Sequence, residues 1–236
     1  MGGIDFNLNG KKLAVASGNQ AIIWDVETEK ETICMEHDDE VISVLFSPDG
    51  RRLATASDDR TVTLWDSKTG DRLAKISLDY KVSLTMFSSN GMKLAVIGHH
   101  MIIVLDVESC RELARIEHSG TRKCIAFSPD GTKLTAGGGG SIKDHNTAKL
   151  WDAETGEELF KMIHRDFVED VAFSPDGKKI VTVGIDRSAR LWDIQVGQAF
   201  TSQELNIAVT AIAFSPDGKK LAVTSVMSTL NCRIKS

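Results

Sequence analysis

The stretch that decides the fold runs from Val41 to Asp66 and reads VISVLFSPDGRRLATASDDRTVTLWD. In the FSPDG segment, Pro48 presets φ, Asp49 caps a turn and Gly50 supplies positive φ, which together predict a β-hairpin. Alternating apolar and β-branched residues around this turn predict four short β-strands, at 41–46, 52–57, 61–66 and 72–78. This part of the chain is therefore expected to form one four-stranded antiparallel sheet.

The same pattern recurs along the whole sequence. FSPDG or a variant of it begins at Phe6, Phe46, Phe87, Phe127, Phe173 and Phe214, with spacings of 40, 41, 40, 46 and 41 residues. Trp-Asp or Leu-Asp follows in phase at 24–25, 65–66, 105–106, 151–152 and 192–193. All four prolines occupy one phase of the repeat and all four tryptophans another. A period of this length indicates an array of similar sheets.

No stretch shows sustained helical periodicity, so we expect an all-β chain. A single small sheet cannot hide both of its faces from water, and packing similar sheets around an axis solves this problem. Period, FSPDG turn and Trp-Asp ending together resemble the WD40 repeat family. The resemblance implies a β-propeller of four-stranded antiparallel blades, with six repeat units of which the last is incomplete. It implies a single domain over 1–236, with units at about 1–37, 38–79, 80–118, 119–164, 165–205 and 206–236.

The resemblance also implies a buried hydrogen-bonded set of histidine, threonine, aspartate and tryptophan in some blades. Two units carry all four residues: His37, Thr55, Asp59 and Trp65 in one, and His164, Thr182, Asp186 and Trp192 in the other. The fourth unit keeps His118 and Trp151 but has Ala136 in place of the threonine. Such a set resembles a nucleophilic triad, yet its recurrence favours a structural role, and no catalytic residues are expected.

Composition excludes several classes of protein. A length of 236 residues with 42% apolar and 26% charged residues predicts a folded globule, and no run is long enough for a membrane span. The net charge of −5 argues against a dedicated nucleic-acid binder. The four cysteines, Cys34, Cys110, Cys124 and Cys232, form no CxxC pair, which favours reduced thiols. We expect a cytoplasmic protein with no cofactor, no metal and no membrane or nucleic-acid partner.

The long spacing in the fourth unit comes from an insertion within the segment GGGGSIKDHN at 137–146. Lys143 lacks the flanking residues of a phosphate-binding loop, so the segment is interpreted as a mobile loop inside one blade. A metal site is a weaker alternative for the histidines and aspartate near this loop: His99, His100, His118, Asp144 and His145.

Function is expected on the face formed by the links between units and by the turns between second and third strands, because these vary in sequence. Aromatic and basic residues often anchor interfaces. The candidates for partner contact are Tyr80, Arg122, Lys143, His145, Phe167 and Arg187.

The resemblance favours a non-catalytic scaffold that binds a protein or peptide on this loop face. One alternative is a detached or truncated regulatory propeller module of a larger signalling protein. A propeller enzyme is a further alternative, but the sequence shows no unrepeated set of acid, base and nucleophile. The incomplete last unit leaves an open edge, which predicts possible self-association there.

Overall fold

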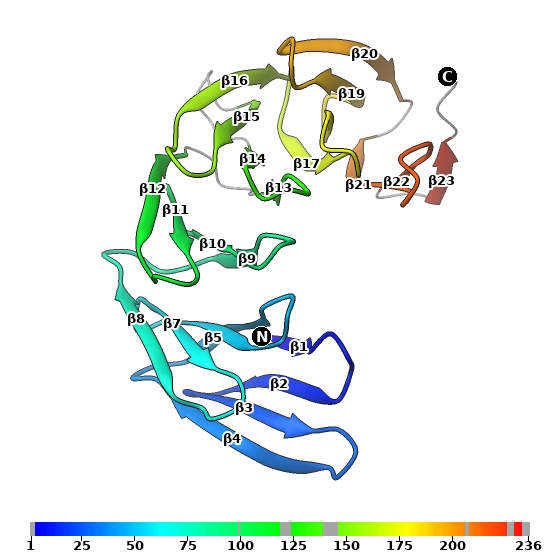
Figure 1. The fold of residues 1–236 in the computed structure, drawn as a ribbon. Coiled ribbons are helices and arrows are strands. Elements are labelled where there is room, and N and C mark those ends of the chain that lie inside the picture. Colours follow the sequence, from blue (N-terminus) through cyan, green and yellow to red (C-terminus); the bar gives the residue numbers. More distant parts are fainter. Residues whose placement is uncertain are drawn as a thin grey trace. The chain divides into compact units, whose positions relative to one another are not determined.

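The computed structural model describes residues 3–98, 100–118, 124–138, 146–205, 208–225 and 229–232. The chain forms two compact units, Met1–Glu117 and His118–Ser236. Each unit is a set of antiparallel sheets whose strands follow one another in chain order across the sheet (Figure 1).

The first unit contains three four-stranded sheets. Its strands are β1 (Ile4–Phe6), β2 (Lys12–Ser17), β3 (Gln20–Asp25) and β4 (Lys30–Glu36); β5 (Val41–Phe46), β6 (Arg52–Ser57), β7 (Thr61–Asp66) and β8 (Arg72–Ser77); β9 (Leu84–Phe87), β10 (Lys93–Ile97), β11 (Met101–Asp106) and β12 (Glu112–Glu117). The bounds of β5, β6 and β7 are those predicted from the alternation of apolar residues.

The second unit contains two four-stranded sheets and one sheet that has three strands among the described residues. Its strands are β13 (Cys124–Phe127), β14 (Lys133–Gly137), β15 (Thr147–Asp152) and β16 (Glu158–Ile163); β17 (Val168–Phe173), β18 (Lys179–Gly184), β19 (Ser188–Asp193) and β20 (Gln198–Glu204); β21 (Val209–Phe214), β22 (Leu221–Ser225) and β23 (Thr229–Cys232). The predicted all-β fold of four-stranded antiparallel sheets with a shorter last sheet is confirmed.

The repeated turn has the predicted chemistry. After β5, the hydroxyl of Ser47 donates to Asp49 Oδ1 at 2.6 Å and accepts the backbone N–H of Arg52 at 3.0 Å. Gly50 adopts a φ of 70°, which a side chain would disfavour. The turns after β13, β17 and β21 repeat the bond between the serine hydroxyl and the aspartate. Each turn therefore satisfies its own polar groups and can recur without support from its neighbours.

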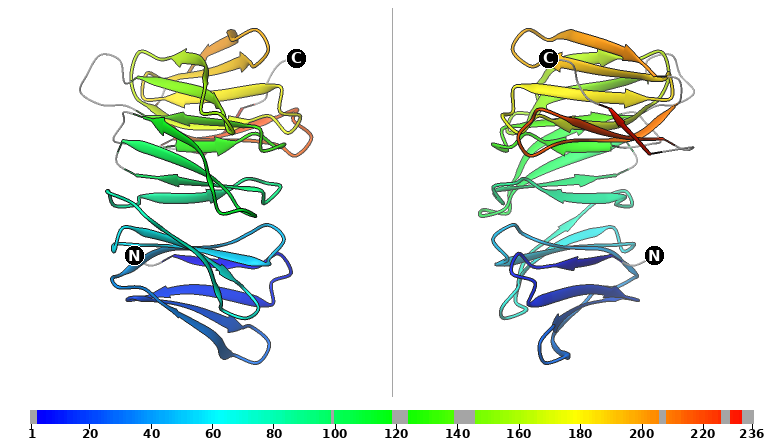
Figure 2. Two further views of the ribbon diagram at one scale, coloured as in Figure 1. Left: turned by 60° about the vertical axis from the view of Figure 1, so that its left-hand side comes forward. Right: turned by 90° about the vertical axis from the view of Figure 1, so that its right-hand side faces the viewer.

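Within each unit, neighbouring sheets pack face against face (Figure 2). Between the sheets β1–β4 and β5–β8, small and branched side chains such as Ala14 and Ile23 pack against Leu53 and Trp65. Between the last two sheets, Val181 and Leu191 pack against side chains of β21 and β22. In both pairs, apolar side chains of one sheet are buried against a face of the next sheet of the same unit.

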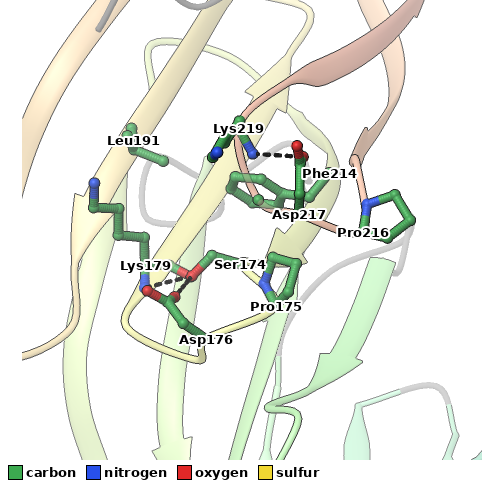
Figure 3. Close-up of a pocket in the computed structure, with 10 residues that line it drawn as sticks. Ser174, Pro175, Asp176, Lys179, Leu191, Phe214, Pro216, Asp217 and Lys219 are labelled. Carbon is green, nitrogen blue, oxygen red and sulfur yellow. Dashed lines mark hydrogen bonds between the residues drawn. The ribbon is translucent and has the colours of Figure 1, made fainter.

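A buried carboxylate ties two sheets of the second unit together. Asp170 on β17 accepts the backbone N–H of Ile212 on β21 at 2.8 Å. Burial raises the pKa of Asp170. The bond joins β21 to β17, and a groove of about 580 Å³ lies between the turns that follow these two strands (Figure 3).

Candidate functional site

The first polar cluster contains one residue of the link between the first two sheets and three residues of the second sheet. His37 follows β4, Thr55 lies on β6 and Trp65 on β7, and Asp59 lies in the turn between β6 and β7. The indole N–H of Trp65 donates to Thr55 Oγ1 at 2.8 Å, and Thr55 Oγ1 lies 2.7 Å from His37 Nε2. His37 Nδ1 lies 3.3 Å from Asp59 Oδ2. The geometry fits a relay in which the hydroxyl donates to the imidazole and the imidazole to the carboxylate.

The second cluster repeats this arrangement in the other unit. The indole of Trp192 donates to Thr182 Oγ1 at 2.8 Å, Thr182 Oγ1 lies 2.7 Å from His164 Nε2, and His164 Nδ1 lies 3.1 Å from Asp186 Oδ2. Burial lowers the pKa of His164. Burial alone would raise the pKa of Asp186, but hydrogen bonds from the Arg165 backbone and other neighbours lower it to about 2. The cluster therefore holds a neutral imidazole beside an ionised carboxylate at neutral pH.

Two further hydroxyls complete these clusters, and sequence reasoning missed them. Thr61 Oγ1 donates to Asp59 Oδ1 at 2.6 Å, and Ser188 Oγ donates to Asp186 Oδ1 at 2.7 Å. A hydroxyl residue two positions after the aspartate, present in both units, is the signal that could have revealed them.

Neither cluster is placed to act on a substrate. Thr55 and Thr182 are both 0% exposed, so a molecule in solvent cannot reach either hydroxyl without displacing the sheets. Each hydroxyl also receives an indole N–H, which occupies one of its acceptor positions. The arrangement satisfies buried polar groups and fixes the link that precedes each sheet.

The fourth repeat unit retains part of this arrangement. The rings of His118 and Trp151 lie edge to face at 5.8 Å, much as His37 and Trp65 do at 5.9 Å. Ala136, which is 1% exposed, takes the place of the threonine. This unit therefore keeps the ring contact but lacks the hydroxyl between the rings.

Among the predicted contact residues, Tyr80 is half buried. Its ring is half buried against the core between the second and third sheets. It lies over Gly98, where a Cβ would come within 2.0 Å of ring atoms. Its hydroxyl is buried without a hydrogen-bond partner among the residues that the structure describes, and burial raises the pKa of Tyr80 to about 12. Tyr80 thus contributes to packing more than to an exposed surface.

Phe167 and Arg187 lie together on the loop face of the second unit. The backbone oxygen of Phe167 accepts the N–H of Ile185 at 2.9 Å, which ties the link before β17 to the turn before β19. Phe167 is half buried, whereas Arg187 is exposed and has a φ of 60°. Arg165, one residue after His164, is also exposed. The backbone of these residues is thus joined to the segments that form the closed polar cluster, and the guanidinium of Arg190 lies 3.4 Å from Asp186 Oδ2.

Three equivalent positions of the first unit carry acidic residues, whereas Arg60 there corresponds to Arg187. Asp38, Glu40 and Asp58 occupy the positions of Arg165, Phe167 and Ile185. Part of this negative charge is paired, because Lys75 Nζ lies 3.0 Å from Asp38 Oδ2 and Lys81 Nζ lies 2.6 Å from Asp58 Oδ2. The same buried hydrogen-bond cluster is thus surrounded by differently charged surface residues in the two units.

The remaining contact candidates, Arg122, Lys143 and His145, lie outside the described residues, as do His99 and Asp144 of the alternative metal site. His100 and His118 belong to the described part, where no group of three or more histidine, cysteine, aspartate or glutamate side chains is arranged to hold a metal ion. The described residues also contain no helix long and apolar enough to cross a membrane.

Comparisons with known proteins agree with the repeat. A WD repeat-containing protein SL1-17 of Schistosoma mansoni is 28% identical over 137 residues, which are 56% of this chain and 46% of that protein. The chain thus spans about half the length of that curated relative. A chain in the crystal structure of a mitotic checkpoint complex superposes with a TM-score of 0.71 at 22% identity, over 95% of this chain and 71% of that chain. That likeness concerns the fold.

The family pattern described as WD domain, G-beta repeat, matches four segments: 29–66, 110–152, 156–193 and 198–235. These segments make up more than half of the sequence, and each ends at or close to a third strand or its equivalent. The chain therefore belongs to the WD40 repeat family.

Proposed function

We propose that this chain is a non-catalytic WD40 scaffold of the cytoplasm that binds a protein or peptide partner on its loop face. WD40 proteins generally act as protein-interaction scaffolds. The choice of this face as the binding surface rests on the second unit around His164. There, Phe167 and Arg187 lie beside a buried polar cluster. Arginine and aromatic side chains are enriched among residues that dominate binding energy.

The buried clusters support a rigid platform. Because His164 and Asp186 hold the link and the turn in place, Phe167 and Arg187 lose little conformational freedom when a partner binds. The exposed guanidinium groups of Arg165 and Arg187 favour a partner segment that carries carboxylates. Self-association through the edge of the last sheet, where β23 has no further strand among the described residues, is a second part of this proposal.

The test is affinity capture with the full chain, followed by mass spectrometry, for wild type and for the double variant Phe167→Ala and Arg187→Glu. We expect the double variant to lose the partners that wild type captures. Tyr80 is not used, because its removal would disturb the core.

Arg60→Glu is the matched control, since Arg60 occupies the same turn position in the first unit and has a similar φ of 65°. This control should keep the captured set. If the double variant and the control capture the same partners as wild type, the proposed face is wrong.

A further inference from the structure

Six turns of the chain place an aspartate or an asparagine directly before a glycine. Asp-Gly follows β5, β13, β17 and β21, whereas Asn-Gly follows β1 at 9–10 and β9 at 90–91. A glycine has no Cβ, so its backbone nitrogen is open to approach by the side-chain amide of a preceding asparagine. The two asparagine turns are therefore candidates for a reaction of the chain with itself.

In the aspartate turns, the side chain is held as a carboxylate. After β13, the hydroxyl of Ser128 donates to Asp130 Oδ1 at 2.5 Å, and the backbone N–H of Thr132 donates to the same oxygen at 3.0 Å. The hydrogen bond from Ser128, together with further donors, lowers the pKa of Asp130 to about 2. At neutral pH this carboxylate is ionised and resists attack by a nitrogen nucleophile. An asparagine amide is neutral and lacks this protection.

The turn after β9 holds its asparagine with the same bonds. The hydroxyl of Ser88, which is buried, donates to Asn90 Oδ1 at 2.7 Å, and the backbone N–H of Met92 donates to it at 3.0 Å. At least two hydrogen bonds must therefore break before the amide of Asn90 can turn toward the nitrogen of Gly91.

The turn after β1 holds its asparagine more weakly. Asn7 stands at the position of Ser88, and its Oδ1 accepts the backbone N–H of Lys12 at 2.9 Å, as Ser88 Oγ accepts that of Lys93. Asn7 has no hydroxyl to donate, so Asn9 Oδ1 accepts only the backbone N–H of Lys11, at 3.0 Å, within the described ranges of the chain. Asn9 is exposed to solvent. One hydrogen bond fewer thus restrains this amide.

The remaining step is common to both turns. The backbone N–H of Gly10 donates to Asn7 O at 2.9 Å and that of Gly91 to Ser88 O at 2.8 Å, so each nitrogen must leave a similar bond before it can react. The strand before the turn is shorter in the first case, with three residues in β1 and four in β9. Local opening therefore costs less free energy at Asn9 than at Asn90.

We propose that Asn9 is a site of spontaneous deamidation in the folded chain. The backbone nitrogen of Gly10 attacks Asn9 Cγ, the new C–N bond closes a succinimide ring, and Nδ2 leaves as ammonia with the proton of Gly10. Water then attacks Cγ, the bond from Cγ to the Gly10 nitrogen breaks, and that nitrogen recovers a proton. The product is aspartate. This modification does not depend on the loop face proposed above.

An aspartate at this position fits the turn. The backbone N–H of Lys11 already lies 3.0 Å from Asn9 Oδ1, just as that of Arg51 lies 3.0 Å from Asp49 Oδ1. Arg51 Nε also lies 3.9 Å from Asp49 Oδ2, and Lys11 occupies the position of Arg51. The product therefore resembles the turn after β5, with a basic side chain two residues after the carboxylate.

The test follows both asparagines in the full chain during incubation at neutral pH. Peptide mass spectrometry measures the gain in mass when the amide nitrogen is replaced by oxygen. Aspartate and isoaspartate, which forms when water attacks the other ring carbonyl, have the same mass and are counted together. We expect Asn9 to react about fivefold faster than Asn90, the factor that corresponds to one typical hydrogen bond. In urea, where both turns are unfolded, the two rates should be similar.

Asn7→Ser is the matched variant, because it supplies the hydroxyl that Ser88 supplies and keeps an acceptor for the N–H of Lys12. In the folded chain it should slow the reaction at Asn9 by about fivefold. It should leave the rate at Asn90, and both rates in urea, unchanged. No reaction at Asn9, equal rates at the two asparagines of the folded chain, or an unaltered rate at Asn9 in the variant would each overturn the proposal.

Discussion

At the scale of single residues, the threonine hydroxyl in each complete cluster makes hydrogen-bonding contacts to both the tryptophan and the histidine. Thr182 Oγ1 accepts from Trp192 and contacts His164, so its loss leaves two buried polar groups without their partner. We expect Thr182→Val to lower the free energy of unfolding by about 1–3 kcal/mol. Urea denaturation measures the change. Thr201→Val, on an exposed strand, should change the value little, and an equal effect of both variants would contradict the structural role.

Acidification should act on the same clusters. Burial lowers the pKa of both His37 and His164, so the folded state binds fewer protons than the unfolded chain. Their stabilising contribution is complete above the unfolded pKa of about 6.5 and is lost as the pH falls below it. A second loss of stability begins near pH 4, the ordinary pKa of an unfolded aspartate, because the pKa of Asp186 in the folded state is only about 2.

The measurement is the free energy of unfolding between pH 8 and pH 5. We expect a decrease below about pH 6.5, with a slope of at most about 1.4 kcal/mol per pH unit for each histidine. His164→Gln should reduce the slope. A flat profile in wild type, or an unchanged slope in the variant, would show that these imidazoles do not govern acid stability.

At the scale of elements, β14 has Ala136 at the position where β6 carries Thr55 and β18 carries Thr182. Because the His118 and Trp151 rings already lie edge to face around Ala136, Ala136→Thr places a hydroxyl where Thr55 stands in the second sheet. We expect a gain in the free energy of unfolding of about 1 kcal/mol relative to Ala136→Val, which has the same shape without the hydroxyl. Thermal denaturation of both variants tests this. A threonine variant no more stable than the valine variant would contradict it.

Sequence predicted the elements well because their determinants are local. The SPDG turns and the alternation of apolar residues act over a few positions, so the bounds of β5, β6 and β7 were accessible. The half burial of Tyr80 was not predictable in this way, because it depends on Gly98, which lies on the next hairpin and leaves room for the ring. The groove between the turns after β17 and β21 was missed for the same reason, since residues of two sheets line it.

At the scale of the whole molecule, the first sheet has an uncovered apolar face. Ile4 pairs with Val15 and Phe6 with Leu13, so these side chains share one face of the sheet. Ile4 is 65% and Phe6 55% exposed, whereas Phe46, the counterpart of Phe6 in the second sheet, is 7% exposed. Exposed apolar patches of this kind favour association.

We therefore expect copies of the chain to associate as concentration rises. Sedimentation velocity at low and high concentration should show a shift in mass that the double variant Ile4→Ser and Phe6→Ser reduces. Leu8→Ser is the control, because Leu8 is 84% exposed but follows β1 in the turn. A shift that persists in the double variant, or no shift in wild type, would remove this face as the cause.

The order of strands within each sheet has a consequence for synthesis. In the part of the chain that the structure describes, each sheet is built from strands that are consecutive in sequence, and no strand crosses to another sheet. Pairing that needs only near neighbours in sequence closes short loops and forms early. Each sheet can therefore complete its hydrogen bonds while the ribosome is still making the residues of the next, so the chain can fold in the direction in which it is made.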